Sequence, residues 1–144
     1  METVLGSCVA IAMFSPRCLV GSLSHCMLPS CGNPKSRTVN CPKEARFVDC
    51  ALHCMLDWFL QRGIRRREIV VKVFGGSDMF SGAEGNSRMG VGRQNIESAL
   101  QVIEQEGLYL AAFDLGGMGG RKIFFKTYTG EIFLKRLNQS ELMR

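Results

Sequence analysis

The stretch "LGSCVAIAMFSPRCLVGSLSHCML", residues 5–28, carries the pattern from which the fold of the chain can be predicted. Its first half holds an uninterrupted apolar run, and its second half alternates apolar with small or polar residues, as a β-strand does. Between them lies Ser15-Pro16-Arg17, where proline suits the corner of a turn. We therefore predict a strand or strand pair over residues 3–14, with a break at Gly6-Ser7, and a second strand over residues 19–28 that pairs with it as an antiparallel hairpin.

A hairpin centred on this turn places Cys8 opposite His25, and directly opposed side chains are within reach of each other. A thiol next to an imidazole is the arrangement of a cysteine nucleophile with its general base. The Gly6-Ser7 turn before Cys8 also leaves backbone N–H groups unobstructed, as an oxyanion site requires. The residues alone leave two interpretations open: a Cys–His catalytic pair, or a small thiol and a histidine that merely pack on strands.

The rest of the chain predicts helices at residues 46–62 and 93–106, each with an apolar stripe at helical spacing. Strands are expected at residues 67–76, 108–117, 121–128 and 131–137, the last two joined by a hairpin at Thr129-Gly130. Residues 29–44 and 77–92 read as long loops. The expected stripes are Val48, Ala51, Leu52, Met55, Leu56 and Phe59 in the first helix, and Ile96, Ala99, Leu100 and Ile103 in the second. This order predicts one α+β domain over residues 1–144, with mixed or antiparallel sheets and two packed helices.

Composition excludes several classes of protein. The formal net charge is +5, and the densest basic run, "RGIRRRE" at residues 62–68, has no interleaved aromatic residues that could stack on bases, so nucleic-acid binding is not expected. That run predicts an exposed loop or a contact with an acidic protein surface. The longest apolar run is far too short to span a bilayer. Without an export or lipoprotein signal before Cys8, we expect a cytoplasmic protein with reduced thiols.

The seven cysteines do not show the close pairing typical of structural zinc sites. The nearest pairs are Cys26 with Cys31 and Cys50 with Cys54, and on a helix His53 points to a different side from Cys54. We expect Cys50 and Cys54 to pack on a helix face, find no role for Cys18, Cys31 or Cys41, and predict neither a metal nor an organic cofactor. The segment "GMGGRK" lacks the spacing of a phosphate-binding loop, so nucleotide binding is not expected.

Several motifs along the chain resemble the CheD family of chemoreceptor glutamine deamidases. They are "LGSCVAI" and "GSLSHCMLP" in the first hairpin, then "RFVDCAL", "KVFGGSDMF", "VGRQNIE", "DLGGMGGRKIFF" and "TGEIFLKRL" in that order. The resemblance implies a bacterial cytoplasmic enzyme at chemoreceptor arrays, which converts glutamine side chains on the helical signalling region of receptors to glutamate and releases ammonia through a thioester. It also implies a fold like the Cys–His catalytic domain of the cytotoxic necrotizing factor toxins, and a CheC-type phosphatase as a possible partner.

Transferred to this sequence, the resemblance makes Cys8 the nucleophile and His25 its base, with Gly6 and Ser7 at the oxyanion turn. The family places a threonine six residues before the cysteine, where this chain has Glu2, so Thr3 is the candidate for the third member. The glycine-rich segments are expected either to line the cleft or to serve only as turns; their candidates are Gly75, Gly76, Ser77, Gly116 and Gly117. Two further interpretations stay open: an adaptor of the same fold with weak catalysis, and a zinc-binding module.

Overall fold

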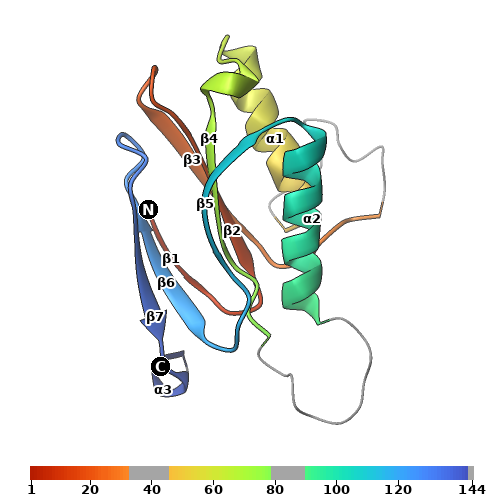
Figure 1. Cartoon of the computed structure of the whole chain (residues 1–144), viewed down its shortest axis with the longest axis vertical. Coiled ribbons are helices and arrows are strands. Elements are labelled where there is room, and N and C mark those ends of the chain that lie inside the picture. Colours follow the sequence, from red (N-terminus) through yellow and green to blue (C-terminus); the bar gives the residue numbers. More distant parts are fainter. Residues whose placement is uncertain (33–45, 79–89, 143–144) are drawn as a thin grey trace.

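The computed structural model describes residues 1–32, 46–78 and 90–142 (Figure 1). Most of the two long loops expected at residues 29–44 and 77–92, and with them Cys41, lie outside the described residues. Within the described residues, no helix is long and apolar enough to cross a membrane.

Two sheets and two helices form three layers (Figure 1). The central sheet has the order β3-β2-β4-β5 and consists of β2 (Val9–Ser15), β3 (Val20–Cys26), β4 (Val70–Gly75) and β5 (Tyr109–Leu115). In it β2 pairs antiparallel with β3 and β4, and β4 pairs parallel with β5. The second sheet is antiparallel, with the order β1-β6-β7, from β1 (Glu2–Leu5), β6 (Gly120–Phe125) and β7 (Ile132–Leu137). Helices α1 (Val48–Gln61) and α2 (Val91–Gln105) cover the other face of the central sheet. The α+β prediction with two packed helices is confirmed.

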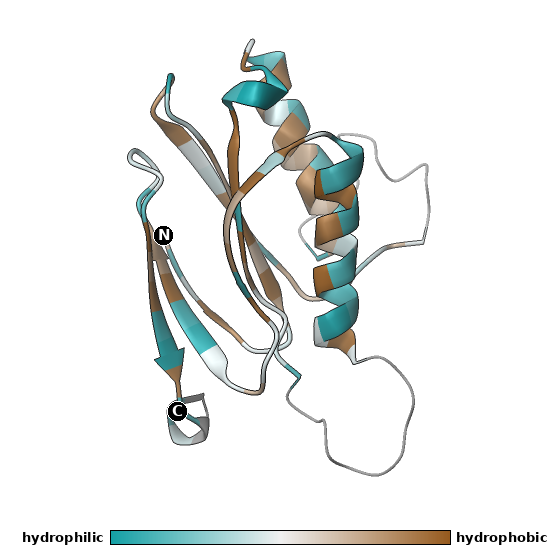
Figure 2. Cartoon of the chain, in the orientation of Figure 1, coloured by the Kyte–Doolittle hydropathy of each residue, from teal (hydrophilic) through white to brown (hydrophobic). Residues whose placement is uncertain are grey.

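Strand β2 is buried along its whole length because both of its faces are covered. Val9, Ile11 and Met13 pack into the core beneath the helices, whereas Ala10 and Ala12 belong to smaller clusters between the two sheets. This explains why residues 9–14 form a continuous apolar run rather than an alternating one. In Figure 2, hydrophilic and hydrophobic residues alternate along α2, as expected of a helix that buries one face.

The first hairpin forms as predicted, but its predicted register is wrong. His25 lies opposite Ala10, not opposite Cys8. The reason is the turn: four residues separate the last pair, Ser15 and Val20, and Leu19 adopts a positive φ of 53° to close it. The shift moves the pairing by an even number of positions, so Cys8 and His25 keep the same face of the sheet.

The helical stripes are confirmed in α1 and only partly in α2. Every predicted stripe residue of α1 is buried. In α2, Ala99 and Ile103 are buried, but Leu100 is 37% exposed and Asn95 takes an interior position instead. Two short elements were not predicted: the 3-10 turn η2 (Arg66–Glu68) and the terminal helix α3 (Gln139–Leu142).

The basic run after α1 is exposed, as predicted. Its arginines already hold carboxylates of the same chain: Arg65 contacts Glu68, and Arg66 contacts Glu106. Docking of this run to an acidic protein stays a prediction.

Candidate active site

The Gly6-Ser7-Cys8 turn connects the two sheets, since it carries the chain from β1 to β2. Its carbonyl groups all accept hydrogen bonds from buried donors. The N–H of Ser77 donates to the Gly6 oxygen at 2.9 Å, and the N–H of Gly76 donates to the Cys8 oxygen at 2.8 Å. The turn is therefore fastened to the end of β4 on its interior side.

The end of β4 requires glycine at positions 75 and 76, because the Gly6-Ser7-Cys8 turn and α2 lie against it. Gly75 has φ +106°, and a Cβ placed there would collide with the carbonyl oxygen of Cys8. Gly76 has φ +70°, and its Cβ would lie 2.9 Å from the Gly92 oxygen and would collide with Ile96. The expected glycine-rich segment thus lets the backbone of β4 and α2 approach the candidate nucleophile closely.

Asn95 ties the turn to the strand that carries His25. Its side chain is fully buried, and its Nδ2 donates to the Ser7 oxygen at 3.0 Å and to the Met27 oxygen at 3.1 Å. Met27 follows His25 by two positions, so one amide group holds both candidate catalytic segments. Sequence reasoning missed this residue, although a polar residue at an interior helix position was the available signal.

His25 extends from β3 and meets β1 of the other sheet. Its Nδ1 lies 2.6 Å from the hydroxyl oxygen of Thr3. Glu2, at the position where the resemblance predicts a threonine, instead forms an exposed ion pair of 2.6 Å with Lys122. The structure therefore brings Thr3, not residue 2, to the imidazole.

Cys8 lies on the same side of the central sheet as His25. It is half-buried and packs with the cluster between the sheets that includes Leu5 and Ala10. His25 is the cross-strand partner of Ala10, two positions beyond Cys8, so the thiol and the imidazole are diagonal neighbours.

Partial loss of hydration shifts the pKa of both groups, even though His25 is an exposed residue of β3. This partial burial raises the pKa of the Cys8 thiol above its ordinary 9.0 and lowers the pKa of His25 below its ordinary 6.5. Near neutral pH the structure thus favours a thiol next to an uncharged imidazole. Burial raises the pKa of Cys26 much further, to about 11, and Cys26 is fully covered, which makes it a packing residue.

The second histidine has a different environment. His53 in α1 lies 2.7 Å from the Asp49 carbonyl through Nδ1 and 3.1 Å from a Glu106 carboxylate oxygen through Nε2. Glu106 follows the end of α2, so His53 connects the two helices. Of the two cysteines expected on the α1 face, Cys50 is buried, whereas Cys54 is half-buried in a shallow hollow lined also by Gly21 and Trp58.

Arg121 in β6 holds the two glycine-rich segments together by hydrogen bonds, and sequence reasoning also missed this residue. It is 2% exposed, and its guanidinium donates to Asp114 at 2.6 Å, to the Ser77 hydroxyl at 2.8 Å and to the Gly116 oxygen at 2.6 Å. Gly75, Gly76 and Ser77 are buried, whereas Gly116 is half-buried and Gly117 exposed. A charged residue within the apolar β6 stretch was the signal for this network.

The sequence of this chain is similar to those of proteins with a known family. The family model described as CheD chemotactic sensory transduction matches residues 27–136, a range that begins just after His25. A protein of Geobacter sulfurreducens named "Probable chemoreceptor glutamine deamidase CheD 2" is 45% identical over 141 residues, which cover 98% of this chain and 82% of the relative. Proteins of Maridesulfovibrio salexigens and Thermococcus kodakarensis with the name "Probable chemoreceptor glutamine deamidase CheD" are 39% and 31% identical, each covering 96% of this chain and 83% of the relative.

Proposed function

Since the chain belongs to the CheD family, we propose that it is an amide hydrolase that converts glutamine side chains of chemoreceptors to glutamate, with Cys8 as nucleophile and His25 as base. The observation that carries the catalytic assignment is the hydrogen bond of 2.6 Å between Thr3 and His25, next to the turn that presents Cys8. The names of the relatives supply the substrate.

Thr3 has the role of orienting the base. When the Thr3 hydroxyl accepts the Nδ1–H of His25, Nε2 is the unprotonated nitrogen and can take a proton from the Cys8 thiol. A residue that holds the imidazole in this tautomer does what the third member of other Cys–His or Ser–His sites does.

The reaction then has two steps. The Cys8 sulfur attacks the amide carbon of the glutamine side chain as His25 takes the thiol proton, and His25 returns that proton to the departing nitrogen, so that ammonia leaves and a thioester forms. Water, deprotonated by His25, attacks the thioester, and the thiol leaves with its proton restored and glutamate as product. The two steps need only Cys8, His25 and water, so the proposed reaction requires no cofactor.

The turn supplies the oxyanion donors. In a trans peptide the C=O of one residue and the N–H of the next point in opposite directions. The Gly6 oxygen accepts from Ser77, and the Ser7 oxygen accepts from Asn95, so both carbonyls face the interior. The N–H groups of Ser7 and Cys8 therefore face the opposite way, toward the side from which a substrate would approach. Loss of one such donor typically costs about 3 kcal/mol of transition-state stabilisation.

The finer assignments belong to the same proposal. We expect the fold to be that of the Cys–His deamidase domain of the cytotoxic necrotizing factor toxins, and the protein to act in the bacterial cytoplasm at chemoreceptor arrays. Its substrate surface would be the helical cytoplasmic region of the receptor, and a CheC-type phosphatase would be a second partner.

The test is to incubate the purified chain with the cytoplasmic fragment of a chemoreceptor from the same organism. Peptide mass spectrometry should show the amide-to-acid mass gain at particular receptor glutamines, together with release of ammonia. Receptor that binds the chain but stays unmodified would contradict the enzyme proposal and support the adaptor interpretation.

A further inference from the structure

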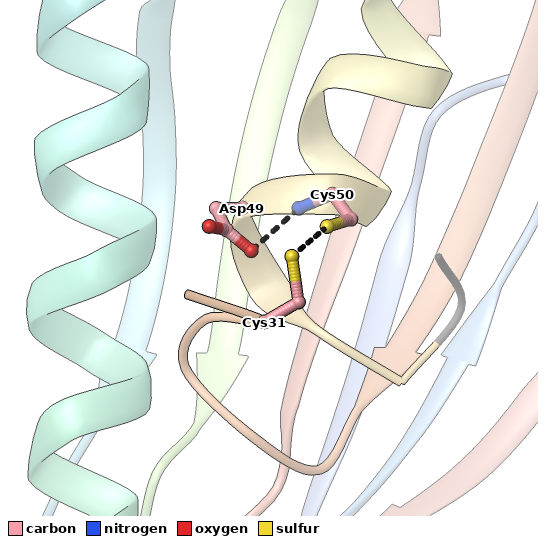
Figure 3. A group of neighbouring side chains, drawn as sticks. All are labelled: Cys31, Asp49 and Cys50. Carbon is pink, nitrogen blue, oxygen red and sulfur yellow. Dashed lines mark hydrogen bonds between the residues drawn. The ribbon is translucent and has the colours of Figure 1, made fainter. Parts of the chain in front are cut away.

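A second group of reactive side chains lies outside the candidate active site, at the start of α1 (Figure 3). The sulfur atoms of Cys31 and Cys50 are 3.3 Å apart. With a carboxylate oxygen of Asp49, these donor atoms all lie within 4.8 Å of one another. Cys50 is 2% exposed, and the other two are half-buried, so the group faces the interior on one side and solvent on the other.

Backbone contacts bring the segment that carries Cys31 to the start of α1. Leu28 forms a parallel bridge with Phe47, and the N–H of Val48 donates to the Leu28 oxygen at 2.9 Å. The N–H of Met27 donates to the Arg46 oxygen at 3.0 Å. The segment that carries Cys31 is thus held against the first turn of α1 by the fold itself.

The carboxylate is held in place by its own partners. The Ser30 hydroxyl donates to one oxygen of Asp49 at 2.7 Å, and the N–H of Cys50 donates to the other at 2.8 Å. Each carboxylate oxygen can accept more than one interaction, so both bonds are compatible with a bound cation. Hydrogen bonds that orient a ligand in this way are a regular feature of metal sites.

We propose that Cys31, Cys50 and Asp49 form a binding site for a zinc-class divalent ion. Two thiolates select a borderline or soft metal over Mg²⁺ or Ca²⁺. Three protein ligands leave the fourth tetrahedral position to solvent, on the half-exposed side. A Cys31–Cys50 disulfide would use only two of the three donors, whereas a cation uses all of them.

This site departs from the sequence-based expectation of no metal. Spacing drew attention to Cys26 with Cys31 and to Cys50 with Cys54, but the fold pairs Cys31 with Cys50. A bound ion would fasten the segment after β3 to α1. That segment includes Met27, whose carbonyl Asn95 also holds, so the ion would stiffen the chain that follows His25.

The test uses the full-length chain, stripped of metal and kept reduced under anaerobic conditions. Titration with Co²⁺ should give the visible bands of a tetrahedral site and a sulfur-to-metal charge-transfer band, with about one ion bound per chain, and Zn²⁺ should displace it. Cys31→Ser and Cys50→Ser should abolish the charge-transfer band. Ser30→Ala should weaken zinc binding about 10- to 100-fold, because it removes only an orienting hydrogen bond.

Cys18→Ser is the matched control, since Cys18 is exposed in the β2–β3 turn, and it should bind metal like the wild type. Zinc should also raise the thermal unfolding midpoint of the wild type and of Cys18→Ser but not of Cys31→Ser. Cys31→Ser is used here because Cys31 is half-buried, so this substitution disturbs the fold less than one at the buried Cys50. Absence of a tetrahedral cobalt spectrum, or persistence of that spectrum in both Cys31→Ser and Cys50→Ser, would overturn the proposal. None of these measurements depends on deamidase activity.

Discussion

Thr3 decides whether His25 is an oriented base or only an exposed strand residue. Its hydroxyl oxygen lies 2.6 Å from Nδ1 of His25, across the boundary between the two sheets. In the sequence, Thr3 lies one position away from where the resemblance predicts a threonine, and only the three-dimensional structure shows which side chain contacts the imidazole.

Thr3→Val removes the hydroxyl and keeps the shape of the side chain. We expect kcat to fall about 10- to 100-fold, because part of the contribution of a general base depends on its orientation. KM and the unfolding midpoint should change little, and Thr3→Ser should restore most of kcat. The control is Glu2→Gln, which removes the exposed pair with Lys122. Unchanged kcat in Thr3→Val, or equal losses in both variants, would contradict the orienting role.

The acidic limb of the pH–rate profile reports the charge state of His25. Burial lowers its pKa, so the uncharged base persists to more acidic conditions than in a peptide. We expect kcat/KM to fall as pH decreases, with an apparent pKa below the ordinary 6.5. A profile that instead rises only toward pH 9.0 and above would show that activity waits for ionisation of Cys8 by solvent, since burial raises the pKa of that thiol.

At the scale of elements, sequence patterns predicted which segments pair but not their register. The hairpin of β2 and β3 and that of β6 and β7 both form as expected. The first is offset because its turn holds more residues than a proline corner suggests. In the structure, Cys8 and His25 still share one face of the sheet, because the offset between the predicted and the observed register is an even number of residues.

The end of β4 supports the turn that carries Cys8, and the role of Gly75 there can be tested against a glycine elsewhere in the chain. Gly75→Ala should destabilise the protein by more than the roughly 1–2 kcal/mol of a left-handed residue, because its Cβ also collides with the Cys8 oxygen. Activity should fall with it. Gly107→Ala is the matched control, with φ +64° and open space around the site of the Cβ, and should cost only the backbone strain. Equal urea-unfolding free energies for the two variants would contradict the close approach.

At the scale of the whole molecule, the candidate site lies where two sheets and α2 meet. The sequence predicts the order of strands and helices because each element carries its own periodicity. It does not show that β1 leaves the central sheet to pair with β6, or that Asn95 and Arg121 reach across layers. Those contacts join residues far apart in the chain, and no local pattern encodes them.

Arg121 links the two sheets by hydrogen bonds, since it extends from β6 to the ends of β4 and β5. Arg121→Met should reduce the free energy of unfolding by about 3 kcal/mol, because it leaves the Ser77 hydroxyl oxygen and the Gly116 carbonyl without the donor that Arg121 supplies. Arg136→Met, which removes an exposed partner of the same Asp114, should cost at most about 1 kcal/mol. Urea unfolding with an unchanged m-value checks both, and similar losses would show that Arg121 does not join the sheets.

The role of Cys8 as nucleophile can be tested by comparing three proteins on one receptor fragment, with modified glutamines measured by mass spectrometry. Wild type and Cys18→Ala should both convert the same glutamines to glutamate, because Cys18 lies exposed in a distant turn. Cys8→Ala should produce no conversion above the receptor alone, while its circular dichroism spectrum and receptor binding stay those of the wild type. Conversion that survives in Cys8→Ala would show that Cys8 is not the nucleophile.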